Sequence, residues 1–141
     1  MRAGTVARWL PLVAALAAAV GVAATVAWAA ARAGGPAEIG IRYSRFTPAA
    51  ITVTAGQPVD IVLRNDDPID HEWIVGDAGV HERHRTGTEP VHDARATEVS
   101  VPAGETRTTT VTFPAPGRYA FICHLPGHEA YGMVGTVVVE P

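Results

Sequence analysis

The most informative stretch of the sequence is segment 121–133, which reads Phe-Ile-Cys-His-Leu-Pro-Gly-His-Glu-Ala-Tyr-Gly-Met. It places Cys123, His128 and Met133 at intervals of five residues. Thiolate and thioether sulfur suit Cu(I), and imidazole suits either oxidation state, so the segment carries three donors of a blue-copper electron-transfer site. The second histidine of such a site has to come from elsewhere. His71 is the best candidate, because it begins a predicted strand directly after a turn.

The residues within this segment predict how its donors meet. Phe121 and Cys123 share one face of a strand by the two-residue alternation of β structure. A tight return over 125–127 then brings His128 back beside Cys123. Gly132 is expected to allow a close approach of the chain before the next strand begins.

Short strands separated by turn signals are predicted over most of the remaining chain. There are seven or eight of them, in the segments 38–43, 51–54, 59–63, 72–75, 97–101, 106–113, 118–123 and 134–139. Such a series is typical of an antiparallel β-sandwich. Only segment 77–96 breaks the rhythm, and we expect it to be a functional loop, a short helix or a mobile excursion.

The N-terminal part has a different composition. Trp9 to Ala31 is a run of 23 residues without a charged side chain, long enough to cross a bilayer core. Arg2 and Arg8 precede the run, which predicts a cytoplasmic N-terminus and an extracytoplasmic remainder. Segment 1–33 is therefore a signal peptide or an N-terminal transmembrane anchor formed by one hydrophobic helix. We favour the uncleaved anchor because of the length of the run and the tryptophans near both its ends.

The rest of the chain is predicted to contain a linker, 34–37, and one domain, 38–141. From residue 34 onwards there are 8 arginines, no lysine and 14 acidic residues, a formal charge of −6 with histidine neutral. An acidic domain argues against nucleic acid as a partner. A lone thiol in an exported protein indicates intermolecular pairing or a reactive role, and metal ligation of Cys123 is another way to keep it.

Two parts of the chain resemble the cupredoxins, the family of type 1 (blue) copper proteins. The first half of the resemblance lies in Phe46-Thr47-Pro48, Ile51-Thr52-Val53, Gly56, Val59, Asn65 and His71. The second half lies in Gly117-Arg118-Tyr119, Cys123, Pro126-Gly127-His128, Gly132-Met133 and Gly135-Thr136. The spacing of this ligand loop is similar to that of the auracyanins, rusticyanin and the phytocyanins.

The resemblance implies an all-β fold, a Greek-key antiparallel β-sandwich with copper at one end. It also implies one type 1 copper per chain, whose ligands would be His71, Cys123, His128 and Met133. Electrons would pass through the ring edge of His128. Segment 77–96 departs from the family pattern and leaves open what lies near that end of the barrel.

We therefore predict an extracytoplasmic one-electron carrier that is not an enzyme. The chain offers one complete ligand set and no plain second set for a catalytic copper with an open position. The expected partner is a redox protein, membrane-associated if the N-terminal segment is an anchor. It would dock on the apolar surface around Leu125, Pro126 and His128, guided by the negative charge of the domain.

A copper-handling protein that buffers or delivers metal is the alternative, and the additional histidines of segment 77–96 favour it. A second, weaker metal site there would draw on His81, His84, His92, Glu82, Glu89 and Asp93. We favour a solvated polar loop instead, because no fixed ligand spacing is present.

Two residues near the expected copper site have open roles. Asn65 either ties down the ligand loop or forms the turn beside Asp66. His124 should point to the opposite side from Cys123 and is expected to be structural or exposed at the rim of the site.

Overall fold

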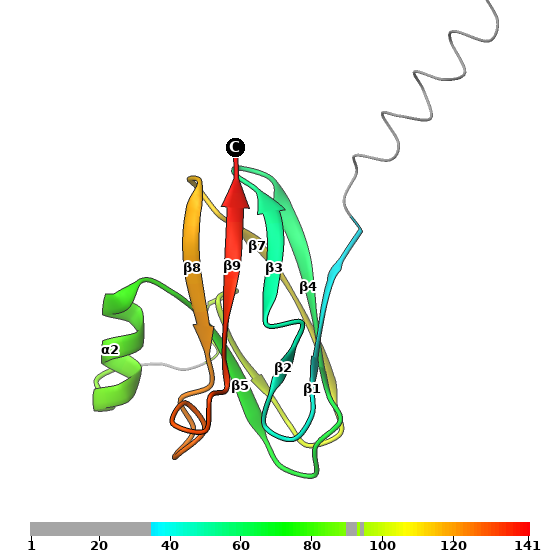
Figure 1. Ribbon diagram of the computed structural model, residues 1–141, viewed down its shortest axis with the longest axis vertical. Helices are drawn as coiled ribbons and strands as arrows, with labels where there is room; N and C mark the ends of the chain where they lie inside the picture. The colour runs from blue at the N-terminus through cyan, green and yellow to red at the C-terminus, as the bar shows by residue number, and fades with distance from the viewer. Residues whose placement is uncertain (1–34, 90–92, 94) are drawn as a thin grey trace, which may run out of the picture. The chain divides into compact units, whose positions relative to one another are not determined.

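Nine strands and one helix form along the described part of the chain, residues 35–89, 93 and 95–141 of a computed structural model (Figure 1). The strands are β1 (Ala37–Ile41), β2 (Phe46–Thr47), β3 (Ala50–Thr54), β4 (Pro58–Asn65), β5 (His71–Gly76), β6 (Glu98–Val101), β7 (Thr106–Thr112), β8 (Gly117–Ile122) and β9 (Val134–Glu140). The helix α2 (Ala78–Thr86) follows β5 in the chain.

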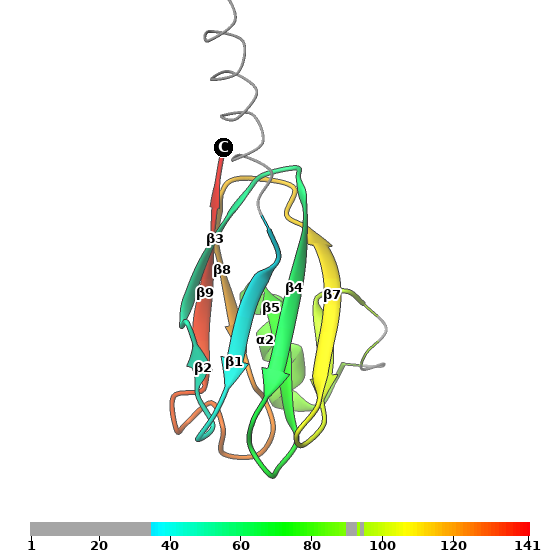
Figure 2. The same ribbon diagram turned by 90° about the vertical axis from the view of Figure 1, so that its right-hand side faces the viewer.

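The strands form two sheets that pack face to face (Figure 2). One sheet has the order β2-β1-β4-β7 and the other β3-β9-β8-β5-β6. Most neighbours are antiparallel, but β1 pairs with β4 and β3 pairs with β9 in parallel. The all-β sandwich is therefore confirmed, whereas a wholly antiparallel pattern is wrong. The chain changes sheets between β2 and β3, so β1 and β3 each join a later strand that runs in the same direction.

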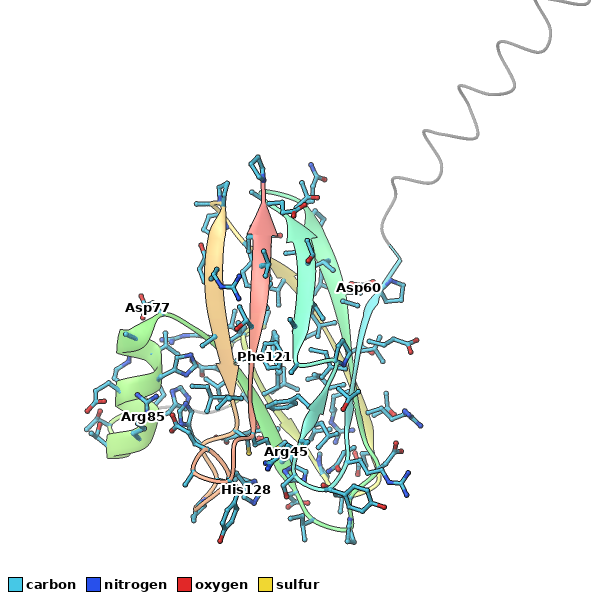
Figure 3. All side chains as sticks on the ribbon, in the orientation of Figure 1. Arg45, Asp60, Asp77, Arg85, Phe121 and His128 are labelled. Atoms are coloured by element: carbon cyan, nitrogen blue, oxygen red, sulfur yellow. The ribbon has the colours of Figure 1, made fainter. Side chains whose placement is uncertain are left out.

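Strand alternation turns one face of each sheet into a shared core. In β4, Ile61 and Leu63 are fully buried, while the residues next to them are more exposed. The predicted inward pair, Phe121 and Cys123, is also fully buried. The Phe121 side chain lies within the sandwich (Figure 3). Its ring meets the Phe46 ring edge to face, with centroids 5.1 Å apart, and so joins the two sheets.

The strand β5 is buried on both faces, because α2 covers the face turned away from the core. Gly76 at the end of β5 permits this close packing. A Cβ at that position would stand 2.8 Å from the Cβ of Val80 in α2. The helix therefore adds a third layer over one part of the sandwich.

The helix lies in segment 77–96, for which the sequence allowed a functional loop, a short helix or a mobile excursion. Asp77 caps its start by accepting a hydrogen bond from the Val80 N–H at 2.9 Å, and Gly87 ends it with a left-handed φ of 66°. The short helix is therefore confirmed for Ala78–Thr86. An Asp and a Gly ten residues apart are the cap signals that could have located it in the sequence.

The expected solvated polar loop is wrong for three residues of this segment. His81 and His84 on α2 and Glu89 after it are all buried. They are buried because α2 lies against the outer face of the sheet.

The predicted hydrophobic segment 1–33 and His92 lie outside the described residues. Among residues 35–89, 93 and 95–141, no helix is long and apolar enough to cross a membrane.

The close packing around Gly135 in β9 leads to a prediction about stability. A Cβ on Gly135 would overlap the Phe121 ring and stand 2.7 Å from the Ala49 carbonyl oxygen. We expect Gly135→Ala to lower the free energy of unfolding by about 3 kcal/mol or more in a urea titration, because neither the buried ring nor the backbone can move away cheaply.

The control is Gly40→Ala in β1, where the added Cβ would stand 3.6 Å from the Thr47 oxygen, an ordinary contact. That change should alter stability by less than about 1 kcal/mol. Equal effects of the two substitutions would contradict the packing described for Gly135.

Candidate metal centre

Three parts of the chain meet at one end of the sandwich. The connection from β4 to β5 leads into His71, β8 leads into Cys123, and the loop between β8 and β9 carries His128. His128 lies at the end of the domain opposite the C-terminus (Figures 1 and 3). Both supporting strands are paired in the same sheet, so the donors stand on rigid elements.

The predicted donors converge closely. His71 Nδ1 lies 3.2 Å from His128 Nδ1, which lies 3.2 Å from Cys123 Sγ. All three donor atoms lie within 4.8 Å of one another. His71 and Cys123 are buried, and His128 is half-buried. A single proton can bridge only two of these atoms, whereas a metal ion satisfies all three, so the group fits a metal centre.

Met133 is fully buried beside this group. Its carbonyl accepts a hydrogen bond from Cys123 N–H at 3.2 Å, and its own N–H donates to the His128 carbonyl at 3.0 Å. These backbone bonds keep the three residues next to one another. Gly132 has a different role from the expected close approach. Its φ is 87°, and the nearest atom to a Cβ there would be an Arg45 nitrogen at 3.5 Å.

His71 is oriented by Asp67, a residue that sequence reasoning missed. Asp67 Oδ2 lies 3.0 Å from His71 Nε2. The same carboxylate accepts hydrogen bonds from the backbone N–H groups of Tyr43 at 2.7 Å and Ser44 at 2.8 Å. Burial raises the pKa of Asp67, but these backbone bonds and His71 outweigh it, so the pKa lies below its ordinary value. A carboxylate that accepts from the other ring nitrogen of a metal-ligating histidine is a common support.

Asn65 stabilises the connection that carries His71. Its Nδ2 donates to the carbonyls of Ile69, Val101 and Pro102 at 2.8, 3.0 and 3.1 Å. Its Oδ1 accepts from the Asp67 N–H at 2.9 Å, as in a turn-forming Asn. Asn65 therefore forms the turn, and the tie it makes is to the β4–β5 connection and the end of β6.

The thiol of Cys123 is held protonated in the absence of metal. Burial raises its pKa to about 11. A metal ligand has to be the thiolate, so metal binding here releases the thiol proton. The buried site thus resists chemistry at the free thiol until a metal takes the place of the proton.

His124 faces away from the metal-ligand group and toward α2. Its Nε2 lies 2.9 Å from His81 Nδ1, and the rings of His124 and His84 are stacked with centroids 5.5 Å apart. Its Nδ1 lies 3.3 Å from Glu129 Oε2, which forms an ion pair only when the ring is protonated, and the two atoms are not aligned as a hydrogen bond. Arg85 of α2 binds Glu129 through both carboxylate oxygens. These contacts join the ligand loop to the helix.

A His–Cys–His donor group at one end of a two-sheet sandwich is the arrangement typical of mononuclear metal proteins of the blue-copper class. The family profile of the cupredoxin-like domain matches residues 12–139, so the chain belongs to the cupredoxin-like family. The expected cofactor, copper, is confirmed by the family and this donor group together.

The relatives carry two kinds of name. The copper-resistant cuproprotein CopI of Rubrivivax gelatinosus is 36% identical over 99 residues, which cover 68% of this chain and 60% of that protein. Auracyanin-B of Chloroflexus aurantiacus is 31% identical over 111 residues, which cover 68% of this chain and 47% of that protein. The chain thus matches about half to three fifths of the length of these two relatives.

The solved structures agree on the fold. The dithionite-reduced auracyanin of the photosynthetic bacterium Roseiflexus castenholzii is 27% identical, with a TM-score of 0.64 over 77% of this chain and 99% of that one. The similarity to the auracyanins that the ligand loop indicated is confirmed.

The burial of His124 predicts how the stability of the fold depends on pH. Burial, and next the proximity of His81, lower the pKa of His124 to about 4 in the folded protein, while an unfolded histidine titrates near 6.5. Between these values the unfolded chain binds more protons, so the stability due to neutral His124 is complete above pH 6.5 and is lost as the pH falls toward 4. The loss is on the order of 3 kcal/mol.

Urea unfolding of the copper-free protein at several pH values tests this. The wild type should lose stability between pH 6.5 and 4 more steeply than His124→Gln, which cannot take up that proton. Parallel pH profiles for the two proteins would contradict the buried neutral state of His124.

Proposed function

We propose that this protein is an extracytoplasmic one-electron carrier with a type 1 copper bound by His71, Cys123, His128 and Met133. The main support for this proposal is that the donor atoms of the first three residues lie within 4.8 Å of one another at one end of a rigid sandwich. Bound copper supplies the one-electron change, and two imidazoles, a thiolate and a weak axial thioether suit both of its oxidation states.

The contribution of the chain is to hold these donors still. Asp67 fixes the ring of His71, and the backbone bonds of Met133 fix the loop from Cys123 to His128. Ligands that cannot rearrange keep the structural change between the two oxidation states small. His128 is the most exposed of the three grouped donors, which supports the edge of its ring as the route for the electron.

The proposed partner is a redox protein that docks at the ligand end. Two large apolar side chains are exposed on the connections that carry the ligands, Ile69 before His71 and Tyr131 after His128. Aromatic and apolar contacts of this kind suit a short-lived docking surface. The formal charge of −6 on residues 34–141 would favour a partner with a basic face.

The proposal keeps the predicted organisation of the chain. Segment 1–33 would be a signal peptide or membrane anchor, 34–37 a linker and 38–141 the cupredoxin domain. An anchor would place the partner in or near the same membrane. We also propose that the protein has no catalytic activity of its own.

Copper handling is the second candidate function. Relatives from Rubrivivax gelatinosus, Pseudomonas aeruginosa and Vibrio cholerae are named copper-resistant cuproproteins. A protein that buffers or delivers copper has to release it to an acceptor, whereas a carrier has to retain it through both oxidation states.

The ligand assignment predicts the colour of the protein. The full chain with Cu(II) should show an intense blue band and bind one copper. Cys123→Ser should lose the band, because no thiolate remains to donate charge to Cu(II), and should bind copper more than about 100-fold more weakly.

The matched control is His124→Gln, which changes the neighbouring residue and should keep the band. Visible spectra and copper analysis of the three proteins provide the test. An intense blue band in Cys123→Ser would refute the proposed ligand set.

Redox cycling separates the two candidate functions. We expect ascorbate to bleach the blue band and ferricyanide to restore it over repeated cycles in the presence of the Cu(I) chelator bicinchoninate, because the buried donors retain copper in both states. Transfer of the copper to the chelator within the first reduction would instead identify a copper-handling protein.

A further inference from the structure

A second group of buried metal-ligand side chains lies between α2 and β6. It consists of His84 on the helix, Glu89 after it and Glu98 at the start of β6, with exposed fractions of 8%, 8% and 2%. One potential donor atom from each residue lies within 4.8 Å of the other two. The group shares no residue with the copper ligands.

We propose that His84, Glu89 and Glu98 bind a divalent transition-metal ion, represented by Zn²⁺, at a site separate from the copper centre. One imidazole nitrogen and two carboxylate oxygens are ligands that Zn²⁺ accepts, and three protein ligands leave a fourth position for water. The group lacks the sulfur donors that select Cu(I), so it differs in chemistry from the first site.

The ring of His84 is held in the orientation that a metal ligand needs. Its Nδ1 lies 2.9 Å from the Val80 carbonyl oxygen, one turn earlier in α2. A carbonyl can only accept, so Nδ1 carries the proton of the neutral ring and Nε2 carries the lone pair. A metal-ligating histidine commonly donates its other ring N–H to a backbone carbonyl in this way.

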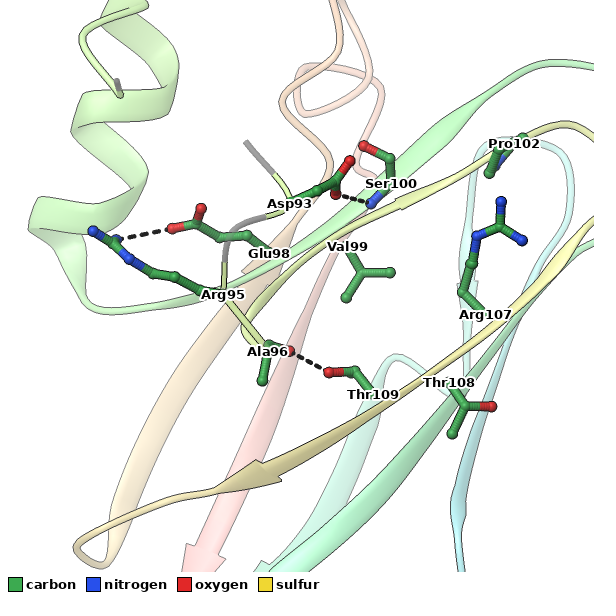
Figure 4. Close-up of a pocket in the computed structure, with 10 residues that line it drawn as sticks. All are labelled: Asp93, Arg95, Ala96, Glu98, Val99, Ser100, Pro102, Arg107, Thr108 and Thr109. Carbon is green, nitrogen blue, oxygen red and sulfur yellow. Dashed lines mark hydrogen bonds and ion pairs between the residues drawn. The ribbon is translucent and has the colours of Figure 1, made fainter. Parts of the chain in front are cut away.

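Glu98 contributes a buried oxygen that needs a partner. Its Oε1 binds Arg95 Nη1 at 3.0 Å, and Figure 4 shows the side chain directed toward α2, on the other side of β6 from Val99. Its Oε2 is buried and has no hydrogen-bond partner among the residues that the structure describes. A buried carboxylate oxygen without a partner is costly, and a bound cation would remove that cost.

Two arginines neutralise the carboxylates when no metal is bound. Arg83 Nε lies 2.9 Å from Glu89 Oε2, and Arg95 Nη1 lies 3.4 Å from Glu89 Oε1 and 3.0 Å from Glu98 Oε1. The hydrogen bond from Arg83 is the main reason that the pKa of Glu89 lies below its ordinary value, so this carboxylate is ionised and ready to bind a cation. Both arginine side chains are exposed and reach in from solvent, so either can withdraw when a cation enters.

Zn²⁺ titration of the copper-loaded full chain tests the site by isothermal calorimetry. We expect one Zn²⁺ per wild-type chain, and at least a tenfold weaker affinity in Glu98→Gln, which keeps the shape of the side chain but not its charge. Glu82→Gln is the control, because Glu82 is an exposed glutamate on the same helix and should leave Zn²⁺ affinity unchanged. Far-UV circular dichroism of each protein reports that the domain is folded.

Two results would overturn the proposal. Absence of Zn²⁺ binding to the wild type would make the group an ion-pair network only. Equal binding by the wild type and Glu98→Gln would place the ion elsewhere. If Glu98→Gln does not fold, Glu89→Gln takes its place in the same comparison. The readout is a difference between variants, so failure of the electron-carrier proposal would leave this test intact.

Discussion

The hydrogen bond between Asp67 and His71 fixes the one imidazole of the His–Cys–His group that does not belong to the loop between β8 and β9. The carboxylate is itself held by two backbone N–H groups from the turn between β1 and β2. A chain of contacts therefore runs from that turn through Asp67 to His71 and on to His128. His71 is positioned through the β1–β2 turn of one sheet, whereas Cys123 and His128 belong to β8 of the other sheet and the loop after it. The His–Cys–His group therefore depends on the packing of both sheets.

The sequence predicted the parts of this protein whose signals are local. The five-residue spacing of Cys123, His128 and Met133 and the alternation within each strand are visible in short windows, and the sandwich and the donor convergence agree with them. The parallel pairing of β1 with β4 was not visible, because it joins segments that no local pattern connects. Asp67 lies only four residues before His71, but it was missed because the backbone groups that hold its carboxylate come from a distant part of the chain. Its partners Tyr43 and Ser44 lie more than twenty residues away.

The helix α2 changes what the outer face of the sheet can hold. A bare sheet face would leave Glu72 and His124 in water, whereas under the helix Glu72 accepts a 2.8 Å hydrogen bond from the His124 N–H. The ion pair between Arg85 and Glu129 lies at the edge of this contact between the helix and the ligand loop. Because buried polar groups are stable only when they find partners, each polar residue of this layer depends on the others. The ligand loop thus packs against the core on one side and against a polar layer on the other.

The direction of the first and last strands has a consequence for how the domain can be attached. The strand β1 runs toward the ligand end, as its register with β4 shows, and β9 runs away from it after Met133. The chain therefore enters and leaves the domain on the side away from the ligands (Figure 1). Attachment of the domain to an electrode at the end of β9 would therefore leave the His–Cys–His end turned outward.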